Sequence, residues 1–275
     1  MSSQSIDILL AQHPVFASLF RLVCALVKTN EVLSSTIAAY ISRYLKQSGM
    51  ELPHAFRIYE SFIRDYDKDI RLFHETGKYP FELTGTIRDI DRLFYDVALL
   101  LSYLVAAHRY RIINCLYDKT KADGKALFVG CGPGAEIDLV KPLFEEIHAF
   151  DMSLNPLLQE LMPDVNFHQE TFPSDDVRDE FEAIYLIEIL EHLEDPYQLL
   201  KSCRDALSGT GRLHLTTATN IPQFDHIYNF PHDHSEFEER IGAMGLKVIS
   251  NDEIGHKYMT ADIAAKNHYY VLVRQ

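Results

Sequence analysis

"ALFVGCGPGAEIDLV", residues 126–140, decides the fold of this chain. It places Gly130, Gly132 and Gly134 directly after an apolar run that is typical of a buried strand. A strand, a glycine turn and a helix that opens near Ala135 form an arrangement that binds nucleotides, because the turn lets a ligand approach and the helix start offers N–H donors. Glycine-rich loops also occur in ordinary turns, so the residues that follow have to distinguish the two interpretations.

Asp151 is the first of these residues. It ends the next apolar run, "HAFD", 19 residues after Gly132. A carboxylate at this place can accept both hydrogen bonds of a ribose diol. The alternative is an aspartate that caps a helix before "MSLNP". Because strand, glycines and acid agree, we favour a role in binding a cofactor.

The rest of the chain from residue 119 alternates between short β-rich runs and helical ones. The expected strands are "KALFVG", "EIHAF", "VNFHQ", "EAIYLI", "GRLHLTT", "LKVIS" and "HYYVLVR", and the helical runs include "DPYQLLKSCRDALSG" and "HSEFEERIGAMG". This alternation predicts the α/β class, with a mostly parallel, Rossmann-like sheet and helices on both faces. The final run is consistent with an antiparallel strand at the edge of the sheet.

Residues 1–118 have a different pattern, which is helical throughout. Apolar side chains recur at helical spacing in a helix that starts near Pro53 and in a long one over residues 86–119, where Thr86 and Asp89 suit an N-cap. "GKYPFELTG" separates the two as a turn. We therefore expect an all-helical N-terminal domain, residues 1–118, and a cofactor-binding domain, residues 119–275.

The composition of the 275-residue chain excludes some classes of binding partner. Its formal net charge of -14 and pI of about 5.3 argue against nucleic acid or an anionic membrane, both of which would repel it. The four cysteines form no CxxC pair, which favours reduced thiols and a cytoplasmic location. His13, Pro14 and Arg21 interrupt the apolar N-terminal stretch, so we expect neither a signal peptide nor a membrane span. A homodimer is left open.

Three segments together resemble the class I S-adenosylmethionine-dependent methyltransferases. "VGCGPG" is similar to their first motif, "AFDMS" to their second and "FEAIYLIEILEHLEDP" to their fourth. The last segment is most similar to ubiquinone-biosynthesis-type small-molecule methyltransferases. The resemblance covers roughly residues 120–275 and implies a seven-stranded sheet with an antiparallel last strand. It also implies S-adenosylmethionine as the cofactor, lying over the strands' C-terminal ends. The helical domain lies outside the resemblance, and we expect it to cover the cofactor and to shape the acceptor pocket.

The resemblance further assigns cofactor contacts to residues that follow the strands. They are Gly130, Cys131, Gly132 and Gly134 for the methionine and ribose part, Asp151 for the ribose hydroxyls, Met152, Glu170 and Thr171 for the adenine, and Leu186, Ile187 and Glu188 for the amino-acid part.

One position departs from the family pattern. Many members carry an acid two residues before the first glycine, where this chain has Phe128. Glu136 either substitutes for that acid or is a first-turn helix carboxylate favoured by the helix dipole. Upstream of the first strand, Tyr110 or Arg111 could bind the cofactor's carboxylate. The alternative is that Arg109 and Arg111 are solvated helix residues.

Catalytic candidates lie in "TATNIPQFDHIYNFPHDH", residues 217–234, where such folds place substrate contacts. His226 could act as a general base at neutral pH, held by Asp225 or Tyr228. His192 is a second candidate, although it is equally typical of a structural histidine. The loop's histidines and aspartates also suggest a metal site, but their spacing matches no standard ligand pattern and we predict no metal. A solvated loop that caps the next helix is the remaining interpretation.

The "EILEHLEDP" segment and the lack of a second nucleotide-binding half favour methyl transfer over hydride transfer. We therefore expect a methyltransferase acting on an O or N nucleophile of a small molecule, in a biosynthetic pathway. A noncatalytic cofactor-binding scaffold is one alternative, and Phe128 is its best support. A peptide or protein methyltransferase, with the helical domain as docking surface, is another.

Overall fold

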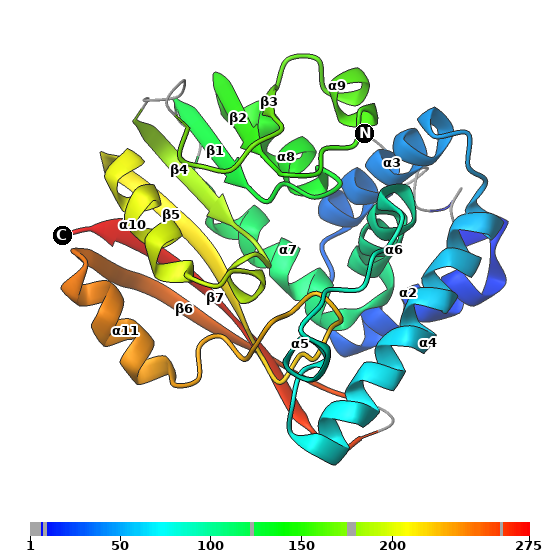
Figure 1. Ribbon diagram of the computed structural model, residues 1–275. Helices are drawn as coiled ribbons and strands as arrows, with labels where there is room; N and C mark the ends of the chain where they lie inside the picture. The colour runs from blue at the N-terminus through cyan, green and yellow to red at the C-terminus, as the bar shows by residue number, and fades with distance from the viewer. Residues whose placement is uncertain (1–6, 8–9, 122–123, 175–179, 259–260) are drawn as a thin grey trace.

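A seven-stranded sheet is the centre of the computed structural model, which describes residues 7, 10–121, 124–174, 180–258 and 261–275 (Figure 1). Its strand order is β3-β2-β1-β4-β5-β7-β6. The strands are β1 (Lys125–Val129), β2 (Glu146–Phe150), β3 (Asn166–His168), β4 (Phe181–Leu186), β5 (Leu207–Thr219), β6 (Leu246–Lys257) and β7 (Ala264–Arg274). The first five strands pair in parallel, whereas β7 runs antiparallel to both β5 and β6.

The predicted α/β class, the mostly parallel sheet and the antiparallel last strand are confirmed. The expected edge position of that strand is wrong, because β7 lies between β5 and β6 and leaves β6 at the edge. β1 pairs with β2 on one side and with β4 on the other. Since parallel strands end at the same edge, the segments that follow β1, β2, β4 and β5 are brought together there.

Helices account for most of the N-terminal part and for the connections between strands. They are α2 (Pro14–Leu26), α3 (Glu31–Gln47), α4 (Leu52–Thr76), α5 (Pro80–Thr84), α6 (Arg92–Val105), α7 (Ala107–Lys119), α8 (Ala135–Val140), α9 (Leu157–Leu161), α10 (Pro196–Ala206) and α11 (His234–Ala243), with 3-10 turns η1 (Lys141–Leu143) and η2 (Leu190–His192). Residues 1–6, 8 and 9 of the expected helical segment lie outside the described residues. None of the helices in the described part has the length and hydropathy that crossing a bilayer requires.

The single helix expected over residues 86–119 is wrong in two respects. It begins later, because the Asp91 carboxylate accepts a hydrogen bond from the Phe94 N–H at 3.0 Å and so caps the helix there. It also breaks at Ala106, whose φ of -122° and ψ of 115° are extended. α6 and α7 are therefore two helices that meet at Ala106.

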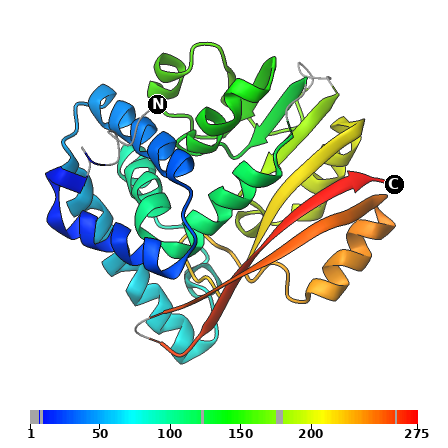
Figure 2. The ribbon, with the colours of Figure 1, turned by 180° about the vertical axis from the view of Figure 1, so that it is seen from behind.

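The helices cover both faces of the sheet. α7 lies across one face and contacts β6 and β7, and α3 packs on α8 beside it (Figure 2). α10 and α11 cover the other face. The larger hydrophobic core contains Ile37 and Leu101 of the N-terminal helices together with Phe128 and Tyr185 of the sheet. The division into domains at residue 118 stays a prediction, because buried side chains from both parts share this core.

Candidate functional site

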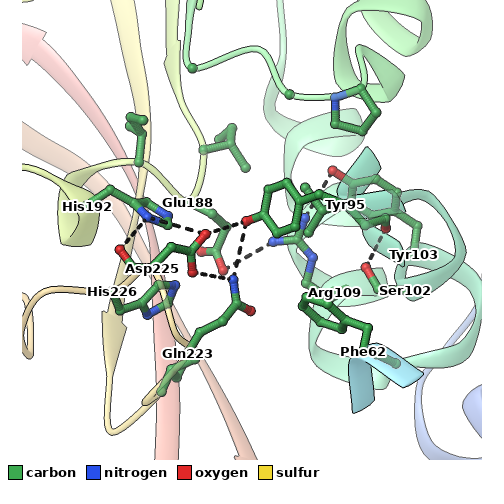
Figure 3. A pocket seen from close by; sticks show the side chains of 18 of the residues that line it. Phe62, Tyr95, Ser102, Tyr103, Arg109, Glu188, His192, Gln223, Asp225 and His226 are labelled. Carbon is green, nitrogen blue, oxygen red and sulfur yellow. Dashed lines mark hydrogen bonds and ion pairs between the residues drawn. The ribbon is translucent and has the colours of Figure 1, made fainter. Parts of the chain in front are cut away.

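A cavity of about 250 Å³ lies where the strand ends meet the N-terminal helices (Figure 3). Segments from three regions surround it. The helices supply an aromatic wall with two arginines, the strand ends supply the glycine turn and carboxylates, and the segments after β4 and β5 supply histidines. The main polar groups that line it are Arg92, Tyr95, Tyr103, Arg109, Glu136, Asp151, Glu188, His192, Gln223, Asp225 and His226.

The glycine turn borders this cavity. Gly132 has a φ of +52°, and a Cβ atom built on it would meet no atom within 4 Å. Gly134 differs, because a Cβ there would lie 2.7 Å from the Met162 side chain. Gly134 is therefore required by packing, whereas the space beside Gly132 opens to the cavity. That space is what a ligand resting on the backbone needs, so the turn fits a nucleotide-type cofactor.

Asp151 is held at the same end of the cavity. One carboxylate oxygen, Oδ2, accepts a hydrogen bond from the Gly132 N–H at 3.1 Å, and Oδ1 accepts one from the Ser153 N–H at 2.9 Å. The Arg92 guanidinium lies 3.5 Å from Oδ1 and pairs with Asp96 at 2.8 Å. The carboxylate is thus fixed beside the turn, with lone pairs left to accept hydrogen bonds from hydroxyl groups.

Arg109 organises the opposite wall. Its guanidinium pairs with Glu188 at 3.2 Å and donates to the Tyr103 hydroxyl at 3.1 Å. The Tyr103 hydroxyl in turn donates to Glu136. Burial raises the pKa of Glu136, although Arg109 and Tyr103 partly oppose that shift. The wall therefore offers one cation for a carboxylate and two carboxylates for an ammonium group.

The cavity brings together most of the expected cofactor residues, namely Gly130, Cys131, Gly132, Glu136, Asp151, Ile187 and Glu188. The remaining ones do not line it. Leu186 lies fully buried in the core on the other face of the sheet, and Met152 is 74% exposed. Glu170 and Thr171 are exposed as well.

The prediction that Tyr110 or Arg111 binds the cofactor's carboxylate also needs correction. Tyr110 points away from the cavity, where its hydroxyl accepts a hydrogen bond from the Asn30 N–H at 2.8 Å. Arg111 is directed outward, toward backbone oxygens of Leu26 and Gly255. Arg109, for which a solvated helix position was the one alternative considered, is the residue that lines the cavity. Arg109 comes seven residues after Ser102 and fourteen after Tyr95, which also line the cavity, so helical spacing was the signal that could have found it.

Asp225 is the centre of the polar cluster that the segments after β4 and β5 bring to the cavity. Its carboxylate accepts hydrogen bonds from the Tyr95 hydroxyl and from Gln223 Nε2, each at 2.7 Å (Figure 3). Its backbone oxygen lies 3.0 Å from Nδ1 of His192. Burial is the largest single influence and opposes ionisation of both side chains. Their mutual attraction, other nearby charges and hydrogen bonds together outweigh it, so the pKa of Asp225 is lowered and that of His192 is raised.

His226 does not suit the role of general base that we expected. It is 3% exposed, and burial together with the nearby His192 lowers its pKa to about 3. Such an imidazole is a weak proton acceptor at neutral pH. Tyr228 also lies apart from the cavity, because its hydroxyl donates to the Leu193 backbone oxygen at 2.6 Å.

Glu191 was missed by the sequence analysis. It is completely buried, and burial with the neighbouring Glu188 raises its pKa to about 8. One ligand atom each of Glu191, His192 and His226 lie within 4.8 Å of one another. The adjacent glutamate and histidine of the "EHLEDP" segment were a sign of this cluster in the sequence. The third residue, His226, comes from a distant loop and could not be assigned from spacing.

Residues 127–213 match the family model described as a methyltransferase domain, and this match includes the glycine turn, Asp151 and the Glu188–His192 segment. These residues form a methyltransferase domain. The match begins in β1 and ends within β5, so the N-terminal helices that cover the cavity lie outside it.

Two curated relatives of the methyltransferase domain are ubiquinone biosynthesis O-methyltransferases. The protein from Haemophilus ducreyi is 28% identical over 117 residues, 37% of this chain and 50% of that protein. The protein from Proteus mirabilis is 27% identical over 123 residues, 40% of this chain and 50% of that protein. This chain thus spans about half the length of the curated relatives it matches.

Among solved structures, the N-methyltransferase NodS from Bradyrhizobium japonicum, in complex with S-adenosyl-L-homocysteine, is similar to this chain with a TM-score of 0.46. The two are 16% identical, and the similarity covers 59% of this chain and 86% of NodS. The fold of the methyltransferase domain is established here by its own strand order.

Proposed function

We propose that this chain is a methyltransferase that transfers the methyl group of S-adenosylmethionine to an oxygen or nitrogen atom of a small molecule, in a biosynthetic pathway. One observation carries the proposal: a single cavity joins the glycine turn and Asp151 to the polar cluster around Asp225. S-adenosylmethionine supplies an activated methyl group on a sulfonium. The protein's own task is then mainly to align the acceptor and exclude water.

The residues of the cavity fit the parts of this cofactor. Asp151 would accept hydrogen bonds from the ribose hydroxyls, next to the open space at Gly132. Arg109 would bind the carboxylate of the methionine part, and Glu136 and Glu188 offer carboxylates for its ammonium group. This charge pattern, one cation beside two anions, matches a zwitterionic amino acid.

The helical cover supports a small acceptor. Tyr59, Phe62 and Tyr66 of α4 and Tyr95 of α6 line the cavity, and the Phe62 and Tyr95 rings are 6.1 Å apart. A covered space of about 250 Å³ suits a small molecule better than a polypeptide segment. The two curated relatives are O-methyltransferases, which favours oxygen as the acceptor atom. A cytoplasmic location belongs to the same proposal, and a homodimer stays open.

The noncatalytic alternative loses its main support. Phe128 stacks on Tyr185 with ring centroids 4.4 Å apart, inside the core and away from the cavity. The acid that this position lacks is compensated by Glu136 and Glu188, which both line the cavity. An apolar residue at position 128 is therefore compatible with a working cofactor site.

Calorimetry with S-adenosylhomocysteine tests the cofactor site. We expect the wild type to bind it and Asp151→Ala to weaken binding by roughly 1.5–3 kcal/mol, the range for losing hydrogen bonds to a charged group. Glu170→Gln is the matched control, because Glu170 was also expected to bind the cofactor but does not line the cavity. Absence of binding by the wild type, or equal affinity of Asp151→Ala, would count against the proposal. Incubation of the wild type with S-adenosylmethionine and panels of small phenols, hydroxy acids and amines then separates O from N transfer.

A further inference from the structure

The N-terminal helices that cover the cavity, called the helical cover below, bring a charged pair to its cofactor end. Arg92 and Asp96 lie one turn apart on α6, and Nε of the arginine is 2.8 Å from Oδ1 of the aspartate. Asp96 is completely buried, so it holds the guanidinium in one position. The same guanidinium reaches Asp151, whose Oδ1 lies 3.5 Å from Nη1. The charged pair belongs to the cover and lies outside residues 127–213, which match the methyltransferase model.

The contacts of Asp151 leave room for a diol. A carboxylate has about four lone-pair sites. The N–H groups of Gly132 and Ser153 occupy two of them. Arg92 at 3.5 Å lies beyond the usual N–H···O range of about 2.7–3.2 Å, so it acts on Asp151 chiefly through its charge. Two sites are therefore left for the two hydroxyls of a ribose, and the cation stabilises the anion that accepts them.

Asp96 also ties the segment after Asp151 to the helical cover. Its second oxygen, Oδ2, accepts hydrogen bonds from the Tyr44 hydroxyl of α3 at 2.7 Å and from the Asn155 amide at 3.0 Å. Asn155 is buried four residues after Asp151, and its amide also donates to the Tyr44 hydroxyl at 2.9 Å. The segment that carries Asp151 is thus held from α3 and α6 as well as from its own strand.

A second tyrosine of α3 extends this contact to the glycine turn. Tyr40, one turn before Tyr44, donates its hydroxyl to the backbone oxygen of Pro133 at 2.6 Å. Pro133 directly follows Gly132, whose N–H donates to the Asp151 carboxylate. The helical cover therefore contacts both parts of the ribose end, the turn through a hydroxyl and the carboxylate through a guanidinium.

We propose that Arg92 is a positioning residue for the cofactor, which acts through Asp151 and makes recognition of the ribose diol depend on the helical cover. Without the cation, Asp96 and Asp151 would be two anions that face one space. Asp96 is enclosed, whereas the Asp151 side chain is 13% exposed, so Asp151 is the one that would turn away. This role rests on the proposed function, because it takes S-adenosylmethionine as the ligand of Asp151.

A pair of ligands measures the diol contact without any need for an acceptor. Calorimetry compares S-adenosylhomocysteine with its 2′-deoxy analogue, which lacks one of the two hydroxyls, and the quotient of the two affinities is the diol ratio. We expect a diol ratio of about ten or more in the wild type, as for loss of a hydrogen bond to a charged group. In Arg92→Met, S-adenosylhomocysteine should bind about tenfold more weakly and the diol ratio should fall toward one. Arg92→Lys keeps the charge and should recover part of both.

Two further variants complete the test. Arg92→Met leaves Asp96 buried without its counterion, which can prevent folding. The double variant Arg92→Met, Asp96→Asn removes the whole pair and should show the same low diol ratio. Arg88→Met is the matched control, because Arg88 also pairs with a buried aspartate of the cover, Asp69, at 2.6 Å but does not line the cavity. We expect its diol ratio to equal that of the wild type.

The possible outcomes separate this role from the proposed function. A wild-type diol ratio in folded Arg92→Met or in the double variant, including the case in which both ligands bind equally more weakly, would overturn the role of Arg92 and leave the proposed function standing. Equal affinity of the wild type for the two ligands would overturn it as well, since Asp151 would then not recognise the diol. Absence of S-adenosylhomocysteine binding by the wild type would contradict both.

Discussion

At the scale of single residues, the glycines of the turn serve different purposes. Gly134 has a φ of +77° and lies against Met162 and the Tyr40 hydroxyl, 2.7 Å and 3.0 Å from where a Cβ would stand. Gly132 also has a positive φ, but its Cβ would enter the open cavity. The same residue type thus relieves packing at one position and admits a ligand two residues away.

This difference predicts that alanine at position 132 mainly lowers cofactor affinity, whereas alanine at position 134 mainly lowers stability. Gly132→Ala should lower the affinity for S-adenosylhomocysteine at least tenfold, because the methyl group occupies cofactor space, and should cost about 1–2 kcal/mol of stability through its positive φ. Gly134→Ala should lose a further 1–3 kcal/mol or so through overpacking. Urea unfolding and calorimetry measure the two effects. Equal cofactor affinity of Gly132→Ala and wild type would mean that Gly132 serves only the turn.

The sequence predicted the site residues that belong to motifs formed by neighbouring residues. The glycines and Asp151 were found because strand, turn and strand end are all local signals. Arg109 was missed because a charged residue on a helix is usually solvated, and Glu191 because its neighbour His226 comes from another loop. Side-chain orientation and long-range clustering are set by tertiary packing, which periodicity does not contain.

At the scale of elements, the start of α6 shows how capping chemistry overrides an apolar stripe. Thr86 and Asp89 have the spacing of an N-cap, yet the helix starts at Arg92 with the Asp91 carboxylate on the Phe94 N–H. Ile87, an apolar residue at the start of the expected helix, is 50% exposed. The elements of the sheet were easier to predict, since each β-rich run is short and bounded by turn residues.

The N-cap at Asp91 predicts different effects of two alanine substitutions on stability. Asp91→Ala should destabilise the protein by about 1 kcal/mol, because it leaves the Phe94 N–H without its acceptor. Thr86→Ala, at an exposed position outside the helix, should change stability by less than about 0.5 kcal/mol. Chemical denaturation of both variants against the wild type measures the difference. A larger loss in Thr86→Ala than in Asp91→Ala would restore the earlier helix start.

At the scale of the whole molecule, polar groups are enclosed in the sheet that the helices cover on both sides. His214 of β5 is fully buried, with its Nδ1 3.1 Å from the Tyr269 hydroxyl of β7 and its ring stacked 4.9 Å from that of Tyr185 of β4. Burial lowers the pKa of His214 to about 3, with smaller contributions from Arg212 and Lys119. The folded protein therefore keeps this imidazole neutral across the mildly acidic range.

This burial predicts a pH-dependent loss of stability. Below about pH 6.5 the unfolded chain protonates His214 whereas the folded protein does not, so unfolding takes up a proton and stability falls as the pH falls. Between pH 7 and pH 5 the contribution of this one histidine is about 2 kcal/mol. His214→Gln should therefore lose about 2 kcal/mol less than the wild type over that interval, whatever its absolute stability. Urea denaturation at a series of pH values measures both curves.

Tyr269→Phe is the matched control for this prediction. It removes the hydroxyl beside Nδ1 but leaves the histidine buried, so its stability should be lower at every pH while its dependence on pH stays like that of the wild type. The comparison separates burial, which is the larger cause of the shift, from the hydrogen bond. Parallel curves for His214→Gln and the wild type would show that His214 is not kept neutral by the fold, and the pH dependence would then have to come from other buried groups.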